Sequence, residues 1–100
     1  MAKLIQTENG LAAKNKSIKK IFGHDQSNIV NIQLKSGEGI PEHDSKDPLF
    51  IIVRSGEVKF TCSGKAYILS NSDILFLEAE ENHSVEAVSD VDFLVVFLRG

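Results

Sequence analysis

Short hydrophobic segments alternate with turn signals along most of the chain. Pairs of small or polar residues that favour turns recur at intervals of roughly 8–12 residues. They are Ser36-Gly37, Asp47-Pro48, Ser55-Gly56, Ser63-Gly64, Asn71-Ser72, Glu81-Asn82 and Ser89-Asp90. The segments between them are rich in Ile, Val, Leu and Phe, whose branched and aromatic side chains pack well on a pleated surface. This rhythm predicts an all-β sandwich or barrel.

Two of these segments alternate apolar and polar side chains. They cover residues 30–35 and 57–62. The apolar positions are Val30, Ile32, Leu34, Val58, Phe60 and Cys62. Successive side chains of a strand point to opposite faces, so this alternation predicts two half-buried strands. The polar residues between the apolar ones, including Asn31 and Gln33, are expected to face solvent.

Three further segments are apolar on both faces. They are Leu49–Val53, Ile74–Leu77 and Phe93–Leu98. A strand of this kind has to be covered on both sides, by a second sheet on the inside and by another layer on the outside. In a chain of 100 residues, a second subunit is the expected outer layer. The pattern therefore predicts a homodimer.

The N-terminal part of the chain, residues 1–27, carries a weaker pattern. Leu11, Ile18 and Phe22 would form the stripe of an amphipathic helix, but Lys14 and neighbouring polar residues interrupt it. The interpretation that fits better is a loop followed by a strand from about residue 17 to about residue 22.

The composition is that of a single domain spanning residues 1–100. A hydrophobic content of 42% and a charged content of 25% are ordinary for a globular chain. The single cysteine, Cys62, excludes an intramolecular disulfide, suits a reducing compartment and is expected to be a buried, inert thiol. No segment has the pattern of a signal peptide or the roughly 20 apolar residues needed to span a bilayer. The expected location is the cytoplasm, without a membrane partner.

The charge distribution disfavours nucleic acid as a partner. The net charge is −3, and a net-acidic chain is a poor electrostatic match for a phosphate backbone. A local basic cluster consists of Lys14, Lys16, Lys19 and Lys20. No aromatic residues interleave with it, so we interpret it as a solvated face.

Two histidines stand in recognisable sequence frames. In the first frame, five residues separate Gly37 from His43, and Gly56 closes the frame. The second frame, residues 71–87, contains an apolar ILFL segment, a short acidic turn and then His83. The two frames resemble the paired motifs of the cupin superfamily, and the resemblance covers about residues 28–98.

The resemblance implies the double-stranded β-helix, or jelly-roll barrel, of cupins. In that fold both histidines lie inside the barrel near one mouth, where His43 ends one strand and His83 begins another. The first cupin motif usually supplies a second histidine and a glutamate as metal ligands. Here Ser45 and Leu49 stand at those positions, so only two of the usual ligands remain.

The two histidines are the candidate ligands for a divalent transition metal such as Fe, Ni, Zn or Mn. Catalytic metal sites normally have about three protein ligands. Asp47 would complete a set of two histidines and one carboxylate, although it precedes Pro48 and is expected to lie in a turn that faces solvent. Glu42 and Asp44 flank His43 and are expected to point to the opposite side of its strand.

Ser45 and Leu49 also have a positive interpretation, because an apolar side chain in place of a charged ligand makes the barrel interior drier. The predicted ligand-binding residues are His43, Ser45, Leu49, Ile51, Phe60, His83 and Val85, with Val53 in the same lining. An apolar pocket with a few polar groups at its rim is the usual composition of a small-molecule site.

Three functions fit this pattern. The first is a stand-alone small cupin that binds a small organic ligand, with metal weakly bound or absent. The second is a metal-dependent enzyme, a dioxygenase or an isomerase, that uses His43 and His83. The third is a metal-free isomerase or epimerase with a histidine as general base. The sequence favours the first, and it leaves the ligand and any reaction open.

Overall fold

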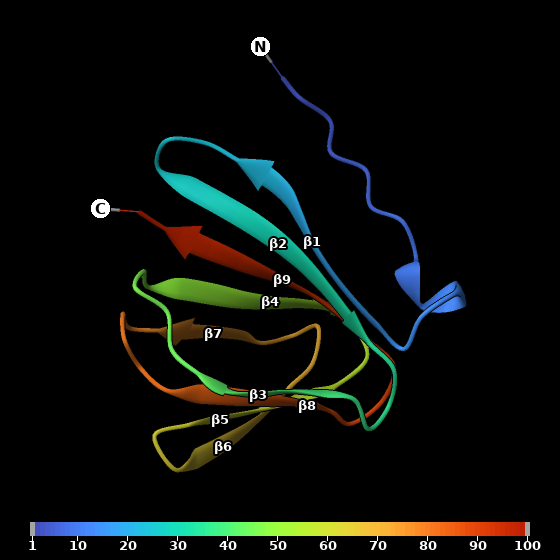
Figure 1. The fold of residues 1–100 in the computed structure, drawn as a ribbon, viewed down its shortest axis with the longest axis vertical. Helices are drawn as coiled ribbons and strands as arrows, with labels where there is room; N and C mark the ends of the chain where they lie inside the picture. Colours follow the sequence, from blue (N-terminus) through green and yellow to red (C-terminus); the bar gives the residue numbers. More distant parts are fainter. Residues whose placement is uncertain (1, 100) are drawn as a thin grey trace.

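The computed structural model describes residues 2–99 as two antiparallel β-sheets packed face to face (Figure 1). A short 3-10 turn, η1 (Gly10–Ala12), precedes the strands. The nine strands of this part of the chain are β1 (Lys16–Gly23), β2 (Ser27–Leu34), β3 (Gly39–His43), β4 (Leu49–Ser55), β5 (Val58–Cys62), β6 (Lys65–Leu69), β7 (Ile74–Leu77), β8 (His83–Ala87) and β9 (Val91–Leu98). All the predicted strands are present, including the one expected at about residues 17–22, which is β1.

Successive strands alternate between the two sheets. The five-stranded sheet has the order β1-β2-β9-β4-β7, and the four-stranded sheet has the order β3-β8-β5-β6. From β2 to β9 the chain changes sheet at every connection except the β5–β6 hairpin. This winding confirms the predicted jelly roll. It also places β9 in the middle of the larger sheet, between β2 and β4.

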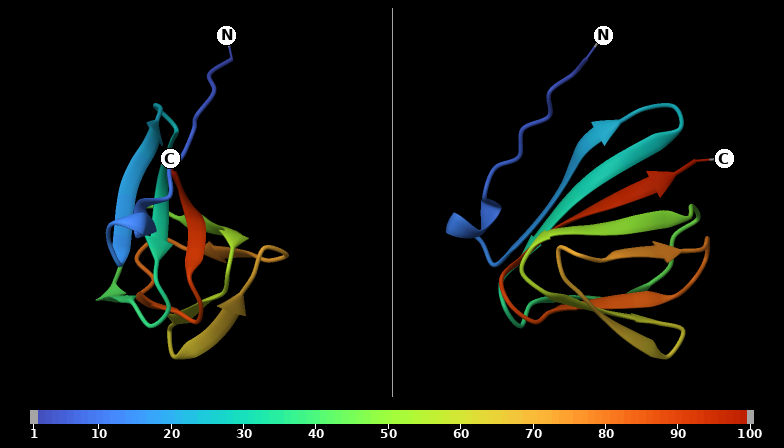
Figure 2. Two further views of the ribbon diagram at one scale, coloured as in Figure 1. Left: turned by 90° about the vertical axis from the view of Figure 1, so that its right-hand side faces the viewer. Right: turned by 180° about the vertical axis from the view of Figure 1, so that it is seen from behind.

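The two sheets form a wedge. They converge where β2 passes into β3 and β8 into β9, and they fan apart at the other end, where β3 passes into β4 and β7 into β8 (Figure 1 and Figure 2). Apolar side chains of both inner faces hold the sheets together. Phe60 of β5 and Phe93 of β9, which are 1% and 0% exposed, meet edge to face with ring centroids 5.6 Å apart. The sheets are therefore joined behind the open end.

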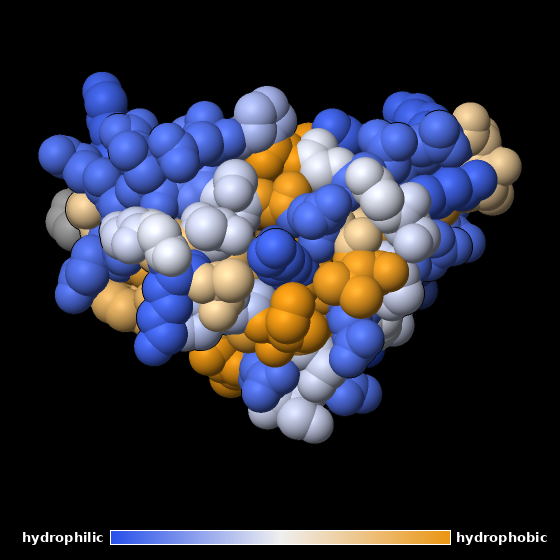
Figure 3. All heavy atoms as spheres, turned by 90° about the horizontal axis from the view of Figure 1, so that it is seen from below, coloured by the Kyte–Doolittle hydropathy of each residue, from blue (hydrophilic) through white to orange (hydrophobic). Residues whose placement is uncertain are grey.

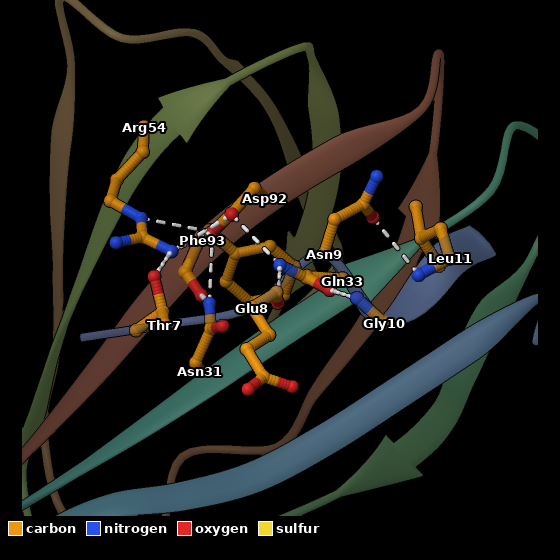
Figure 4. Close-up of polar contacts among 10 residues, drawn as sticks. All are labelled: Thr7, Glu8, Asn9, Gly10, Leu11, Asn31, Gln33, Arg54, Asp92 and Phe93. Carbon is orange, nitrogen blue, oxygen red and sulfur yellow. Dashed lines mark hydrogen bonds and ion pairs between the residues drawn. The ribbon is translucent and has the colours of Figure 1, made fainter. Parts of the chain in front are cut away.

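The prediction that Asn31 and Gln33 face solvent is wrong. Their side chains are buried on the outer face of β2, because the extended N-terminal arm, residues 2–9, covers that face. The Gln33 side chain donates to the carbonyl of Glu8 at 3.0 Å and accepts from the amide of Gly10 at 2.6 Å (Figure 4). Asp92 of β9 accepts from both buried amides. The arm thus supplies a covering layer that the alternation of residues could not reveal.

The outer face of the five-stranded sheet stays apolar across β9, β4 and β7. Phe50 and Phe76 are cross-strand neighbours whose ring centroids lie 5.1 Å apart. Ile74 and Phe76 are 66% and 43% exposed, which leaves room for the second covering layer that the sequence predicts. Hydrophobic side chains also interrupt the polar surface on the underside of the molecule (Figure 3). No helix within residues 2–99 is long and apolar enough to cross a membrane.

Candidate ligand-binding site

A cavity of about 410 Å³ lies between the two sheets at the open end of the wedge. The seven residues predicted for a ligand site all line it: His43, Ser45, Leu49, Ile51, Phe60, His83 and Val85. Val53 is buried in the core but does not line the cavity. Ile18, Phe93 and Val95 line it without having been predicted. Phe93 and Val95 belong to a segment that is apolar on both faces, so its pattern could not show which side chains face the cavity.

The two histidines lie opposite each other at the mouth of the cavity. His43 is the last residue of β3 and His83 the first of β8, as the cupin resemblance implies, and the two residues are paired across the strands. Their ring centroids are 4.3 Å apart, and the ring planes make an angle of 62°. Phe60 stacks on the other side of His83, with ring centroids 6.3 Å apart. The His83 side chain is therefore fixed between an aromatic ring and its histidine partner.

Backbone carbonyls orient both imidazoles. The Nδ1 atom of His43 lies 2.8 Å from the carbonyl oxygen of Pro41, and that of His83 lies 3.0 Å from the carbonyl oxygen of Glu81. A carbonyl only accepts, so Nδ1 carries the proton in each ring and Nε2 of the neutral imidazole is an acceptor. The His83 side chain is only 4% exposed, and within residues 2–99 its Nε2 has no hydrogen-bond partner. In its neutral form, each ring at the mouth of the cavity therefore keeps Nε2 free as an acceptor.

Two loops meet beside the histidines and shape the mouth. The amide of Glu80, in the β7–β8 loop, donates to the carbonyl of Ser45, in the β3–β4 loop, at 2.6 Å. The Ser45 hydroxyl in turn accepts from the amide of Asp47 at 3.2 Å. These bonds tie the loop after His43 to the loop before His83, so the mouth has a defined backbone frame.

The residues present do not form a complete metal site. Asp47, the predicted third ligand, does not line the cavity. In the described part of the chain, no three side chains of His, Cys, Asp or Glu converge closely enough to hold a metal ion. Leu49, at the position of the usual glutamate, is 2% exposed and has no donor atom. Two imidazoles are fewer than the roughly three protein ligands of a typical catalytic site.

Asp44 is an acidic residue of the lining that the sequence interpretation did not include among the ligand-binding residues. The strand ends at His43, and the β3–β8 pairing is irregular between Ile40 and His43, so strict alternation no longer sets the direction of the next side chain. Asp44 is the only carboxylate of the lining, and the lining contains no Lys or Arg.

Cys62 lies next to the site without belonging to it. It pairs with His83 across β5 and β8 and is 4% exposed, but it does not line the cavity. Burial raises the pKa of the Cys62 thiol, and the negative charge of Glu81 raises that pKa further. The thiolate is therefore disfavoured at neutral pH, as expected for a structural cysteine rather than a nucleophile.

Similar folds occur in several solved structures. An RmlC-like cupin from Methanocaldococcus jannaschii has a TM-score of 0.84 at 21% identity, over 98% of this chain and 91% of that one. An RmlC-like cupin from Desulfovibrio desulfuricans has a TM-score of 0.78 at 23% identity, over 95% and 97%. The DMSP lyase DddQ from Ruegeria pomeroyi has a TM-score of 0.78 at 15% identity, over 92% and 51%. At these identities the likeness shows the fold alone.

Sequence comparison defines the family. No curated protein matches the chain. The family model of the cupin domain, Cupin_2, matches residues 30–98, which include both histidines and most of both sheets. The chain therefore belongs to the Cupin_2 family of cupin domains.

Proposed function

We propose that this cupin domain binds a small organic ligand in the cavity between its sheets. The observation that carries the proposal is an apolar cavity with two imidazole Nε2 acceptors at its mouth. The volume of about 410 Å³ lies within the roughly 300–1,000 Å³ of small-molecule sites. Such sites combine apolar walls with a few oriented polar groups, which is the composition found here.

The lining supports binding without a metal. Leu49 and Ile51 of β4 and Phe60 of β5 give apolar walls that bury the body of a ligand. Burial of apolar surface is favourable by roughly 25 cal/mol per Å². The carbonyl bonds to both Nδ1 atoms hold the rings in place before a ligand arrives, which lowers the entropic cost of ordering them on binding.

A screen of small organic compounds against isotope-labelled protein tests the proposal. A bound compound should shift the amide signals of β3, β4 and β8 and raise the unfolding temperature. Ile40→Trp places a large ring at a half-buried position of the cavity wall and should weaken binding by about tenfold or more. Lys59→Trp, at a position that does not line the cavity, is the matched control and should bind as the original chain does.

Metal dependence is tested in the same experiment. Protein stripped with a chelator should bind the same compounds with unchanged affinity, because the lining supplies the contacts. Binding that disappears on stripping and returns with Fe, Ni, Zn or Mn would favour the metal-dependent alternative instead. A screen in which no compound saturates the cavity would contradict the proposed function.

A further inference from the structure

We infer that the cavity prefers ligands that carry a protonated primary amine on an apolar body. This inference rests on the proposed function and names the chemical class of its ligand. It follows from the kind of polar atoms at the mouth, from the sign of the charges around it, and from the apolar walls behind it.

The polar atoms at the mouth are acceptors. Nδ1 of each imidazole is engaged with a backbone carbonyl, so neutral His43 and His83 present only Nε2 lone pairs to a ligand. Asp44, an exposed acidic residue, belongs to the same lining. The Nε2 atom of His83 is the most telling of the three, because the side chain is 4% exposed and has no other group to pair with at that atom within residues 2–99.

The charges near the mouth are mostly negative. The lining holds one carboxylate and neither Lys nor Arg. Within the described residues Asp44 forms no ion pair, since the one salt bridge there joins Arg54 and Asp92. The two mouth loops carry Asp47, Glu78, Glu80 and Glu81 against Lys46. A negative rim around a low-dielectric cavity attracts cations and repels anions.

A primary ammonium matches this arrangement in its number of hydrogen-bond donors and in the sign of its charge. It has three N–H donors and no acceptor, and three lining residues, His43, His83 and Asp44, can each supply an acceptor group. An alcohol has one donor and would leave the carboxylate without its charge partner. A carboxylate ligand would bring a second negative charge beside Asp44, with no cation in the lining to balance it. The apolar walls then require an alkyl or aryl body.

Calorimetric titration with matched compounds tests the inference. Hexylamine, hexanol and hexanoic acid share one body, and 2-phenylethylamine, 2-phenylethanol and phenylacetic acid share another. The amine of each set should bind about tenfold more tightly than the alcohol, because charge-assisted hydrogen bonds are stronger, and the acid should bind most weakly. An alcohol or acid that binds as tightly as its amine would overturn the inference and leave the proposed function standing. Failure of all six compounds would also overturn the inference, while the broader screen decides the proposed function.

Two variants test whether the Asp44 carboxylate contacts the amine directly or acts only through the overall negative charge near the mouth. Asp44→Asn and Glu42→Gln each remove one negative charge beside His43, but only Asp44 lines the cavity. Asp44→Asn should reduce amine affinity by about tenfold and leave alcohol affinity unchanged. Glu42→Gln should change amine affinity by less than about twofold. Equal losses in the two variants would show that the carboxylate of Asp44 does not contact the amine, and would overturn the assignment. Both residues are exposed, so neither change threatens the fold.

Discussion

Gly56 adopts a backbone conformation that a side chain would disrupt. Its φ is +79°, in the left-handed region, and a Cβ built there would lie 2.0 Å from the carbonyl oxygen of Asp90. Gly37 has a similar φ of +88°, but no atom lies within 4 Å of its would-be Cβ. The two motif glycines therefore share a backbone requirement and differ in the space around them.

The comparison of Gly56→Ala with Gly37→Ala isolates that difference. Gly37→Ala should lower the free energy of unfolding by roughly 1–2 kcal/mol, the cost of a left-handed conformation with a Cβ. Gly56→Ala should lower it by about 1–3 kcal/mol more, because the backbone of Asp90 has to move. Urea unfolding of both variants measures the two losses. Equal losses would mean that the turn at Gly56 relaxes without strain.

The family resemblance located the histidines of the site. The resemblance of the frames around His43 and His83 to the cupin motifs implied that both rings lie at one mouth, and the two residues are paired across β3 and β8. Asp44 was left out of the predicted lining; it lies just beyond the end of β3, where alternation no longer sets the direction of a side chain. The orientation of each Nδ1 could not be predicted at all, since it depends on carbonyls whose direction the sequence does not reveal.

One polar network attaches the N-terminal arm to the five-stranded sheet. Asp92 of β9 accepts from Asn31 at 2.8 Å, from Gln33 at 3.0 Å and from the guanidinium of Arg54 at 2.8–3.0 Å (Figure 4). Arg54 also donates to the hydroxyl of Thr7. The arm and three strands are thus joined through side chains that a two-residue period would assign to solvent.

Removing Gln33 from this network should release the arm and leave the sandwich folded. Gln33→Leu removes the partners of the Glu8 carbonyl and the Gly10 amide, so hydrogen exchange at Gly10 should speed up by about tenfold or more. Thr61→Leu, on the four-stranded sheet, should leave that exchange unchanged. Amide exchange followed by NMR measures both variants. Unchanged exchange at Gly10 in Gln33→Leu would show that other contacts hold the arm.

Six of the nine described strands could be predicted from local patterns of apolar residues and turns, whereas β3 and β8 followed only from the family resemblance. The arm could not be predicted, because the hydrogen-bond partners of Thr7, Glu8 and Gly10 lie 23–47 residues away along the chain and the arm shows no strong period of its own. Strand pairing was also out of reach, since it joins segments as distant as β2 and β9. Local patterns therefore gave most of the elements, and the family resemblance gave their arrangement.

The apolar outer face of the five-stranded sheet supports the homodimer predicted from sequence. Outward-facing residues of neighbouring strands form one continuous surface, with Phe50 beside Phe76 and Val96, and Ile52 beside Ile74 and Leu94. A contiguous exposed apolar surface of this kind usually marks an interface. We propose that a second copy of the chain covers it.

Sedimentation analysis of the chain and two variants tests the dimer. The original chain should sediment as a dimer, and Phe76→Glu should shift it to the monomer, because a buried, unpaired carboxylate opposes association. Ile68→Glu changes a similarly exposed apolar residue on β6 of the other sheet and should leave the dimer intact. A dimer that survives Phe76→Glu and is lost in Ile68→Glu would place the interface on the four-stranded sheet. A monomeric original chain would contradict the prediction.

The central place of β9 has a consequence for how the protein comes to be folded. While a ribosome is still making the chain, β2 and β4 have no strand between them, and their facing edges expose unpaired amides and carbonyls. The arrival of β9 closes both edges in one step, after the other eight strands have been synthesised. Folding should therefore be late and slow for so short a chain, because it waits on contacts between distant residues. A pause in translation before β9 would leave the unpaired edges of β2 and β4 free to associate with neighbouring nascent chains.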